Sequence, residues 1–263
     1  MLKVTFDSNV WRIVSSPEIF PNEPSIEVFK KINGEITVGE ISPFLAETTF
    51  TLEAIRKADR KSALSSYSPV VSCSEKVLPD GTIKLSLSIG PDKSTHPRNN
   101  QCLSSHLQYA LDLGFKILRC PRISGFKNPD LQEDWFVGQT DAEAHERQEL
   151  FGSVLRDIES KGCGIFEIKS IGEKYAPNPG KWLDGIRSAP DSESPLVAKA
   201  FAEWADGDSV SAHIAYRNDY FCTRDVGKSA GTQSILSQAN RSWLREKYGV
   251  NFVTPEELAT MLA

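Results

Sequence analysis

The sequence lacks several patterns that would assign it to a well-known class of protein. Its five cysteines are scattered, their number is odd, and no two of them form a C-x-x-C pair. This usage indicates reduced thiols rather than a disulfide framework. No apolar run approaches the ~20 residues that span a bilayer, and the first residues do not have the organisation of a signal peptide. We therefore expect a cytoplasmic protein that does not associate with membranes.

A nucleotide-binding loop is absent as well. Gly227-Lys228-Ser229 is similar to the end of such a loop, but the pattern G-x-x-x-x-G-K-[ST] requires a glycine where this chain has Cys222. The formal net charge of −5 disfavours a protein that coats nucleic acid, because such proteins are usually basic. Net charge says little about a local site, so a nuclease remains compatible with this composition.

The fold class follows from strand-like apolar runs that alternate with helical patterns. The 263 residues are enough for one large domain with its own core, spanning residues 1–263. We expect strands at residues 2–6, 35–38, 116–120, 165–168, 220–223 and 251–254. We expect helices at residues 25–34, 43–64, 142–160, 195–206, 208–216 and 237–248, and a last helix from residue 255. This alternation predicts a three-layer α/β/α protein with a mainly parallel central sheet.

One region interrupts the alternation. Two apolar runs at residues 70–77 and 82–89 flank Asp80-Gly81, a residue pair typical of a two-residue hairpin turn. The residues that follow are polar and rich in turn formers. We therefore expect a β-hairpin insertion at about residues 67–101 within the single domain.

Two aspartates follow predicted strands. Asp7 comes directly after the first strand, and Asp225 follows the strand at residues 220–223. In parallel sheets, ligand sites gather beyond the carboxyl ends of the strands. Each aspartate alone fits a turn or a salt bridge, but their matching positions predict that the two carboxylates share a site.

Two further carboxylates belong to predicted helices. Glu47 lies between Phe44 and Phe50 within an apolar stripe, where a carboxylate either sits at the edge of the stripe or meets a cation. Asp208 precedes a helical pattern, so it is either part of the carboxylate site or the N-cap of that helix. Asp206 lies two residues earlier and is an alternative to Asp208.

A divalent metal ion would explain a cluster of carboxylates. Carboxylate oxygens select hard cations such as Mg²⁺ and Mn²⁺. Two such ions roughly 4 Å apart can activate a water and stabilise the leaving oxygen of a phosphodiester. Without metal, the clustered carboxylates would repel one another.

These motifs, in this order, resemble those of the PIN-domain nucleases. The first resembles the opening strand and "D-[ST]-N" loop of that family, and the fourth resembles its "f-x-T-x-D" motif. The matching stretches are Val4-Thr5-Phe6-Asp7-Ser8-Asn9-Val10, Ser42-Pro43-Phe44-Leu45-Ala46-Glu47, Asp208-Ser209-Val210-Ser211-Ala212-His213-Ile214-Ala215, Tyr220-Phe221-Cys222-Thr223-Arg224-Asp225 and Tyr248-Gly249-Val250-Asn251-Phe252-Val253-Thr254-Pro255-Glu256-Glu257-Leu258. The resemblance covers about residues 1–60 and 195–260, and the middle of the chain is longer than in compact members.

The resemblance implies a metal-dependent endonuclease that usually cleaves RNA. It implies Mg²⁺ or Mn²⁺ as the cofactor, and a metal-bound water as the nucleophile. The implied metal ligands and catalytic residues are Asp7, Glu47, Asp208 and Asp225, with Asp206 as the alternative third ligand. Asn9 and Thr223 would support the loop that carries the first aspartate.

Basic residues near these motifs are candidates for binding the RNA backbone. Those expected closest to the metal are Arg217, Arg224 and Lys228. A second group follows Glu47 along the chain, and it is either a solvated helix end or a rail for the nucleic-acid backbone: Arg56, Lys57, Arg60 and Lys61.

Two alternatives to an active nuclease stay open at the level of sequence. One is a catalytically inactive PIN-like module that uses its insertion to bind a protein partner. The other is a toxin that a protein inhibitor neutralises. Homodimerisation is compatible with each of these readings.

Overall fold

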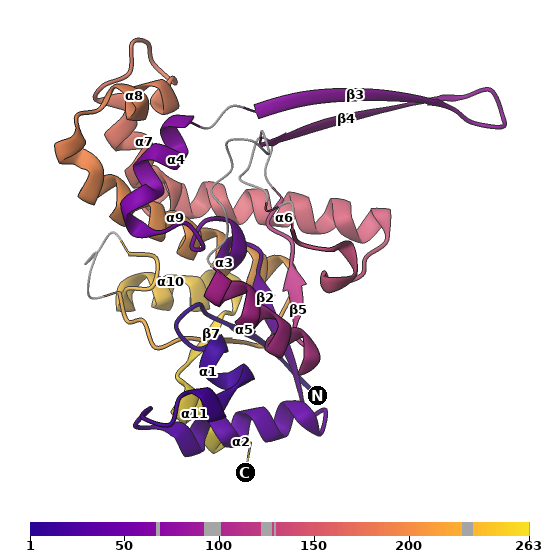
Figure 1. Cartoon of the computed structure of the whole chain (residues 1–263), viewed down its shortest axis with the longest axis vertical. Helices are drawn as coiled ribbons and strands as arrows, with labels where there is room; N and C mark the ends of the chain where they lie inside the picture. The colour runs from indigo at the N-terminus through magenta and orange to yellow at the C-terminus, as the bar shows by residue number, and fades with distance from the viewer. Residues whose placement is uncertain (67–68, 92–100, 122–127, 129, 228–233, 263) are drawn as a thin grey trace.

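A five-stranded parallel sheet forms the centre of the protein (Figure 1). The computed structural model describes residues 1–66, 69–91, 101–121, 128, 130–227 and 234–262. The strand order is β5-β2-β1-β6-β7, and every neighbouring pair is parallel. The strands are β1 (Leu2–Phe6), β2 (Ile41–Ala46), β5 (Lys116–Leu118), β6 (Tyr220–Cys222) and β7 (Asn251–Val253). The predicted α/β class with a mainly parallel sheet is confirmed.

Helices cover both faces of this sheet. One face packs against α1 (Trp11–Ser15), α2 (Ile26–Thr37), α5 (Gln101–Asp112) and α11 (Pro255–Met261). The other face packs against α6 (Asp141–Ser160), α9 (Ser194–Ala215) and α10 (Gln238–Tyr248). Successive strand residues point to opposite faces, so Val4 and Phe6 enter the first layer while Thr5 accepts or donates a hydrogen bond at 2.9 Å with His213 of α9. The predicted three-layer arrangement is present.

A smaller group of helices packs against the N-terminal half of α9. It consists of α4 (Arg60–Ser66), α7 (Ile165–Glu173) and α8 (Trp182–Ser188), which lie together in Figure 1. These helices share an apolar core with the buried side chains of Phe201 and Trp204. Short helical segments complete the connections: η1 (Pro17–Ile19), α3 (Thr48–Thr51), η2 (Lys57–Asp59), η3 (Glu133–Trp135) and η4 (Asp191–Glu193). None of the described helices is long and apolar enough to cross a lipid bilayer.

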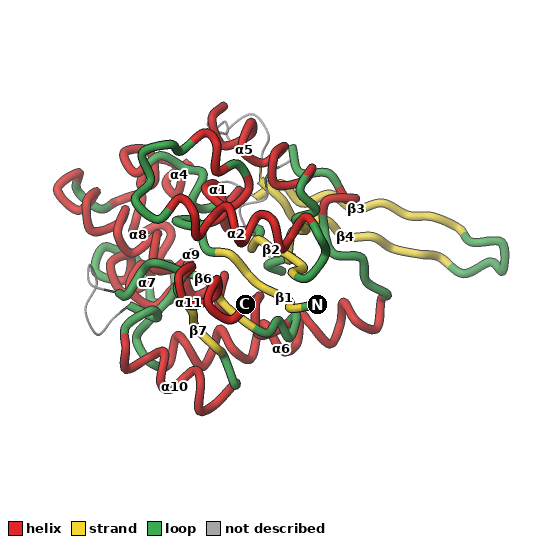
Figure 2. Tube along the Cα trace, turned by 90° about the horizontal axis from the view of Figure 1, so that it is seen from below, coloured by secondary structure: helices red, strands yellow, loops and turns green. Residues whose placement is uncertain are grey.

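The predicted hairpin is also confirmed. Strands β3 (Pro69–Val77) and β4 (Ile83–Pro91) pair antiparallel and extend away from the body of the molecule in both views (Figures 1 and 2). Gly81, in the turn, has φ +81°, a conformation that glycine adopts without steric cost. One face of this ribbon is apolar and exposed, with Val71, Val77, Ile83, Leu85 and Leu87 each at least 60% exposed.

The predicted strand at residues 35–38 is wrong. Helix α2 continues through Gly34 to Thr37, and it ends before Gly39, which has φ +84°. The left-handed residue that closes a helix is therefore Gly39 rather than Gly34. The strand predicted at residues 165–168 is wrong as well, because these residues begin α7, in which Ile168 and Ile171 are buried at helical spacing.

The predicted helix at residues 43–64 is wrong in its first part. Residues 41–46 form β2, which lies between β1 and β5 and is covered on both faces. A strand buried in this way reads as a continuous apolar run, without the alternation that marks a half-exposed strand. Glu47 therefore follows a strand instead of lying inside a long helix.

The two helices predicted on either side of Gly207 form one continuous helix, α9. Gly207 does not interrupt this helix. Its role is to allow another segment of the chain to approach the helix closely. A Cβ atom at position 207 would lie 3.0 Å from the Cα of Gly164 and 3.6 Å from Cγ2 of Ile158. The missing side chain lets the turn between α6 and α7 approach the backbone of α9.

This contact predicts opposite effects for two glycine substitutions. Gly207→Ala should lower the free energy of unfolding by about 1 kcal/mol, because crowding at the contact outweighs the helix propensity that alanine adds. Gly34→Ala is the matched control, since Gly34 is exposed within α2 and a Cβ there meets nothing within 4 Å. The control should raise stability by up to about 1 kcal/mol. Urea unfolding measures both changes, and equal effects would contradict the packing role of Gly207.

Candidate metal centre

The strand order reverses at β1. From β1 the chain proceeds outward to β2 and β5, and then returns to the other side of β1 to form β6 and β7. Open α/β sheets bind ligands beyond the carboxyl ends of the strands at such a switch point. Asp7 follows β1 and Thr223 follows β6, so both residues lie at this position.

Four hydrogen bonds fix the loop after β1. The Oγ1 atom of Thr223 donates to Oδ2 of Asp7 at 2.5 Å, and Nδ2 of Asn9 donates to the same oxygen at 2.9 Å. The backbone N–H of Ser8 donates to Oδ1 of Asp7 at 2.7 Å. Asn9 also accepts a hydrogen bond at 3.1 Å from the backbone N–H of Arg224. Together these bonds orient the carboxylate of Asp7 and join the loops after β1 and β6.

Three carboxylates meet beside this loop. Asp7, Glu53 and Asp206 each place one oxygen so that the three atoms lie within 4.8 Å of one another. They come from three elements: the end of β1, the turn after α3, and the middle of α9. Thr48 and Ser209 share a hydrogen bond of 2.7 Å that holds α3 against α9. This bond helps to set the spacing between the side chains of Glu53 and Asp206.

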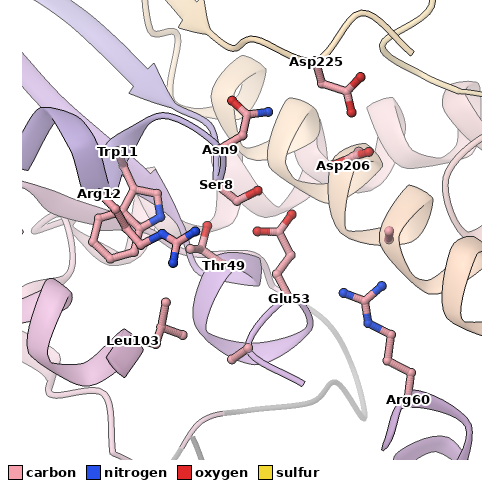
Figure 3. A pocket seen from close by; sticks show the side chains of 12 residues that line it. Ser8, Asn9, Trp11, Arg12, Thr49, Glu53, Arg60, Leu103, Asp206 and Asp225 are labelled. Atoms are coloured by element: carbon pink, nitrogen blue, oxygen red, sulfur yellow. The ribbon is translucent and has the colours of Figure 1, made fainter. Parts of the chain in front are cut away.

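Two of the three carboxylates line a cleft of about 480 Å³. Glu53 and Asp206 line it directly, and Asp225 lines it from the loop after β6 (Figure 3). Arg12 and Arg60 also line the cleft, so it carries both signs of charge. Its remaining lining residues are Ser8, Asn9, Trp11, Thr49, Ala54, Leu103 and Ala202.

The carboxylates strongly perturb one another. Burial, together with the charge of Asp7, raises the pKa of Glu53 to about 7. Burial raises the pKa of Asp206 well above its ordinary value, and the charges of Asp7 and Glu53 raise it further. The pKa of Asp7 is also raised by burial, against the opposing hydrogen bond from Thr223. A cation at this point would favour the ionised form of all three groups.

The donor set fits a hard divalent cation. The Oε2 atom of Glu53 is buried and has no hydrogen-bond partner among the described residues. Leaving such an atom unsatisfied costs free energy. Oxygen donors from several carboxylates are the ligands that Mg²⁺ and Mn²⁺ prefer. The cluster can therefore hold one of these ions and offer open positions toward the cleft.

Glu47, a predicted metal ligand, does not join this cluster. Its Oε2 atom accepts a hydrogen bond at 2.9 Å from the backbone N–H of Cys120, and its own N–H donates to the carbonyl of Leu118 at 3.0 Å. These contacts tie the end of β2 to the end of β5. The seven residues from Glu47 to Glu53 make up α3 and its flanks, and they place Glu53 in the cleft instead.

Asp208 does not join the cluster either. Successive residues of an α-helix are rotated by about 100°, so residues two positions apart point to nearly opposite sides. Because α9 is continuous, Asp206 faces the cleft and Asp208 faces the interior, where it is 1% exposed. The choice between the two aspartates depends on helix rotation, and the structure places the alternative residue, Asp206, at the cleft.

The basic residues predicted near the metal lie elsewhere or outside the described residues. Arg217 is exposed and pairs with Glu146 of α6. Arg224 forms a bidentate ion pair with Glu23, with N···O distances of 2.7 and 3.1 Å. Its guanidinium carbon lies 4.5 Å from the ring centroid of Phe29. Lys228 falls outside the residues that the structure describes. Their predicted contact with substrate stays a prediction.

Sequence reasoning missed Glu53 and Arg12. A signal for Glu53 was present in the apolar run at residues 41–46. If this run is interpreted as a buried strand, the helical segment begins only after it, and the next carboxylate along the chain after Glu47 is Glu53. Arg12 follows the Asp7 loop closely, and it is exposed at the edge of the cleft. No sequence pattern distinguishes it from an ordinary surface arginine.

Comparison of the chain with protein-family models, with curated proteins and with solved structures finds no match. The function is therefore inferred from the geometry of the cleft together with the sequence motifs.

The geometry places Glu53 in the carboxylate cluster and Glu47 outside it. Glu53→Gln should weaken Mn²⁺ binding by at least about tenfold, because it removes a charge from the cluster. Glu47→Gln is the matched control and should change Mn²⁺ affinity less than about twofold, since Glu47 lies outside the cluster. Calorimetric titration of both variants decides the point. A large loss with Glu47→Gln and none with Glu53→Gln would reverse the assignment.

The raised pKa of Glu53 predicts how pH acts on the site. Because its folded pKa is about 7, against an ordinary value of 4.5, Glu53 contributes stability that is complete below about pH 4.5 and is lost as pH rises through about 7. Metal binding requires the ionised carboxylate. Below about pH 7, Mn²⁺ affinity should therefore increase with increasing pH, by roughly tenfold per pH unit for each proton released. Titration calorimetry at several pH values measures this slope. Glu53→Gln should reduce it, and a slope of zero in the unsubstituted protein would contradict the electrostatic account.

Proposed function

We propose that the chain is a PIN-like, metal-dependent endonuclease that hydrolyses phosphodiester bonds, most often in RNA. The observation that carries the proposal is the convergence of Asp7, Glu53 and Asp206 to within 4.8 Å at the switch point of the sheet. Asp225 lines the same cleft from the loop after β6. The resemblance of the motifs around Asp7 and Asp225 to those of PIN-domain nucleases supports the same conclusion.

In this proposal, Glu53 and Asp206 replace Glu47 and Asp208 in the set of ligands. The three clustered carboxylates hold Mg²⁺ or Mn²⁺, and Asp225 adds negative charge beside them. The bound ion supplies a water of lowered pKa and neutralises charge on the phosphate. The protein positions the ligands, and Thr223 and Asn9 orient Asp7 through their hydrogen bonds to its Oδ2 atom. The cytoplasm is the proposed compartment, supported by the scattered cysteines of the sequence.

A second candidate is a catalytically inactive module that binds another protein. The β3–β4 ribbon favours it, because Val71, Ile83 and Leu87 present an exposed apolar face far from the cleft. Exposed apolar surfaces of this kind often mark interaction sites. A toxin with a protein inhibitor would use both the cleft and such a surface. These candidates differ from the first in whether the cleft performs chemistry.

The direct test is cleavage of single-stranded RNA by purified protein with Mn²⁺. Asp7→Asn keeps the size of the side chain and removes its charge, so it should lower the cleavage rate by more than about 100-fold. Its circular dichroism spectrum and thermal midpoint should show a folded protein. Glu47→Gln serves as the control and should cleave at about the unsubstituted rate, because Glu47 lies outside the cluster.

Two results would overturn the proposal. One is unsubstituted protein that binds Mn²⁺ yet cuts neither RNA nor DNA, which would favour the inactive module. The other is equal cleavage by the unsubstituted protein and by Asp7→Asn, which would indicate a contaminating nuclease. Addition of a chelator should abolish the activity in every case that supports the proposal.

A further inference from the structure

Arg60 differs from the other basic residues around it. Four basic residues follow α3 in the sequence, and three of them are exposed or pair with a carboxylate outside the cleft. Arg56 pairs with Asp59 at 2.7 Å, Lys61 pairs with Asp191 at 2.8 Å, and Lys57 is exposed. Arg60 instead lines the cleft together with the carboxylates.

The guanidinium of Arg60 is held in a fixed orientation. Its Nη1 atom donates to the carbonyl of Ala198 at 2.7 Å, and its Nε atom donates to the carbonyl of Ile55 at 3.3 Å. It also lies over the ring of Phe201, 5.5 Å from the centroid. Arginine loses considerable rotamer freedom when it binds an anion. These contacts restrict that freedom before any substrate arrives.

One edge of this guanidinium remains available. The Nη2 atom of Arg60 has no hydrogen-bond partner among the described residues, and Figure 3 shows the group directed into the cleft toward Glu53. The charges of Glu53 and Asp206 both act on it. It therefore faces the metal-binding carboxylates without forming an ion pair with them within 4.0 Å among the described residues.

Charge balance indicates what this edge would bind. When ionised, Asp7, Glu53, Asp206 and Asp225 carry one negative charge each. Two divalent ions would neutralise them, and the positive charges of Arg12 and Arg60, which both line the cleft, would then be left for an anion. Mg²⁺ sites are commonly completed by phosphate oxygens of the substrate instead of by protein ligands alone. A phosphodiester supplies one negative charge and oxygens that can reach both the ion and the guanidinium.

We propose that Arg60 is a phosphate-binding residue that holds a non-bridging oxygen of the phosphodiester beside the metal site. This inference rests on the proposed function, and it identifies the group in the cleft that recognises the substrate backbone. Arginine suits the role because its planar fork matches the geometry of a phosphate, whereas lysine offers a single point of charge.

The test measures binding of an uncleavable, fluorescently labelled 2′-O-methyl oligoribonucleotide in the presence of Mn²⁺. Arg60→Gln should weaken this binding by at least tenfold, and it should lower the slope of log affinity against log salt by about 0.7, the value for one phosphate contact with a single strand. Arg60→Lys should keep the slope and lose several-fold in affinity. Arg56→Gln, which removes an equal charge from the surface, should change affinity less than about twofold.

Mn²⁺ affinity separates this role from a merely structural one. Removing a positive charge beside the carboxylates should leave the affinity of Arg60→Gln for Mn²⁺ unchanged or raise it. Loss of Mn²⁺ binding together with oligonucleotide binding would overturn the inference, since Arg60 would then only position the carboxylates. An unchanged salt slope in Arg60→Gln would also overturn it. If Arg60→Gln does not fold, a reduced slope in Arg60→Lys contradicts the inference by itself. Failure of the unsubstituted protein to bind Mn²⁺ would instead overturn the proposed function.

Discussion

Parallel pairing of β1 with β6 is the constraint on which the rest of the site depends. It places the carboxyl ends of two strands, more than 200 residues apart in the sequence, side by side. Thr223 can then donate directly to Asp7, and Asn9 joins both loops. Without this pairing, Asp7 would lose its hydrogen bond from Thr223. The loop that carries Asp225 would also lose its position beside the cleft.

The second requirement is that carboxylates stay close in spite of their repulsion. Burial raises the pKa of Asp7, Glu53 and Asp206, and the charge of a neighbouring carboxylate raises each of these pKa values further, so the fold opposes their ionisation. The three residues come from separate parts of the chain: the loop after β1, the turn after α3 and the middle of α9. Residues that oppose local stability in this way are typical of functional sites. The repulsion between carboxylates is thus concentrated at the point where a bound cation would offset it.

The sequence predicted most of the helices and strands. It was less informative about where they begin and end and about which side of a helix faces the cleft. The α/β class, the hairpin and the strands before Asp7 and Asp225 were predictable, because apolar runs and turn residues mark them locally. Glu53 was not found, because β2 is buried on both faces and its apolar run was interpreted as helix. Asp206 was only the alternative to Asp208, because the match to the family motif favoured Asp208. The sequence did not show that one helix continues through Gly207, which accommodates Gly164 of a distant segment. Long-range packing decided both cases.

The β3–β4 ribbon has a consequence for how the molecules behave at high concentration. Within the described residues, each of its two strands has one edge without a strand partner, and one face exposes Val71, Ile83 and Leu87. Unpaired strand edges are templates onto which another chain can add. We therefore expect association between molecules to depend on this ribbon, which extends away from the cleft. Solubility and ion binding should accordingly respond to separate sets of substitutions, so either property can be engineered while the other is preserved.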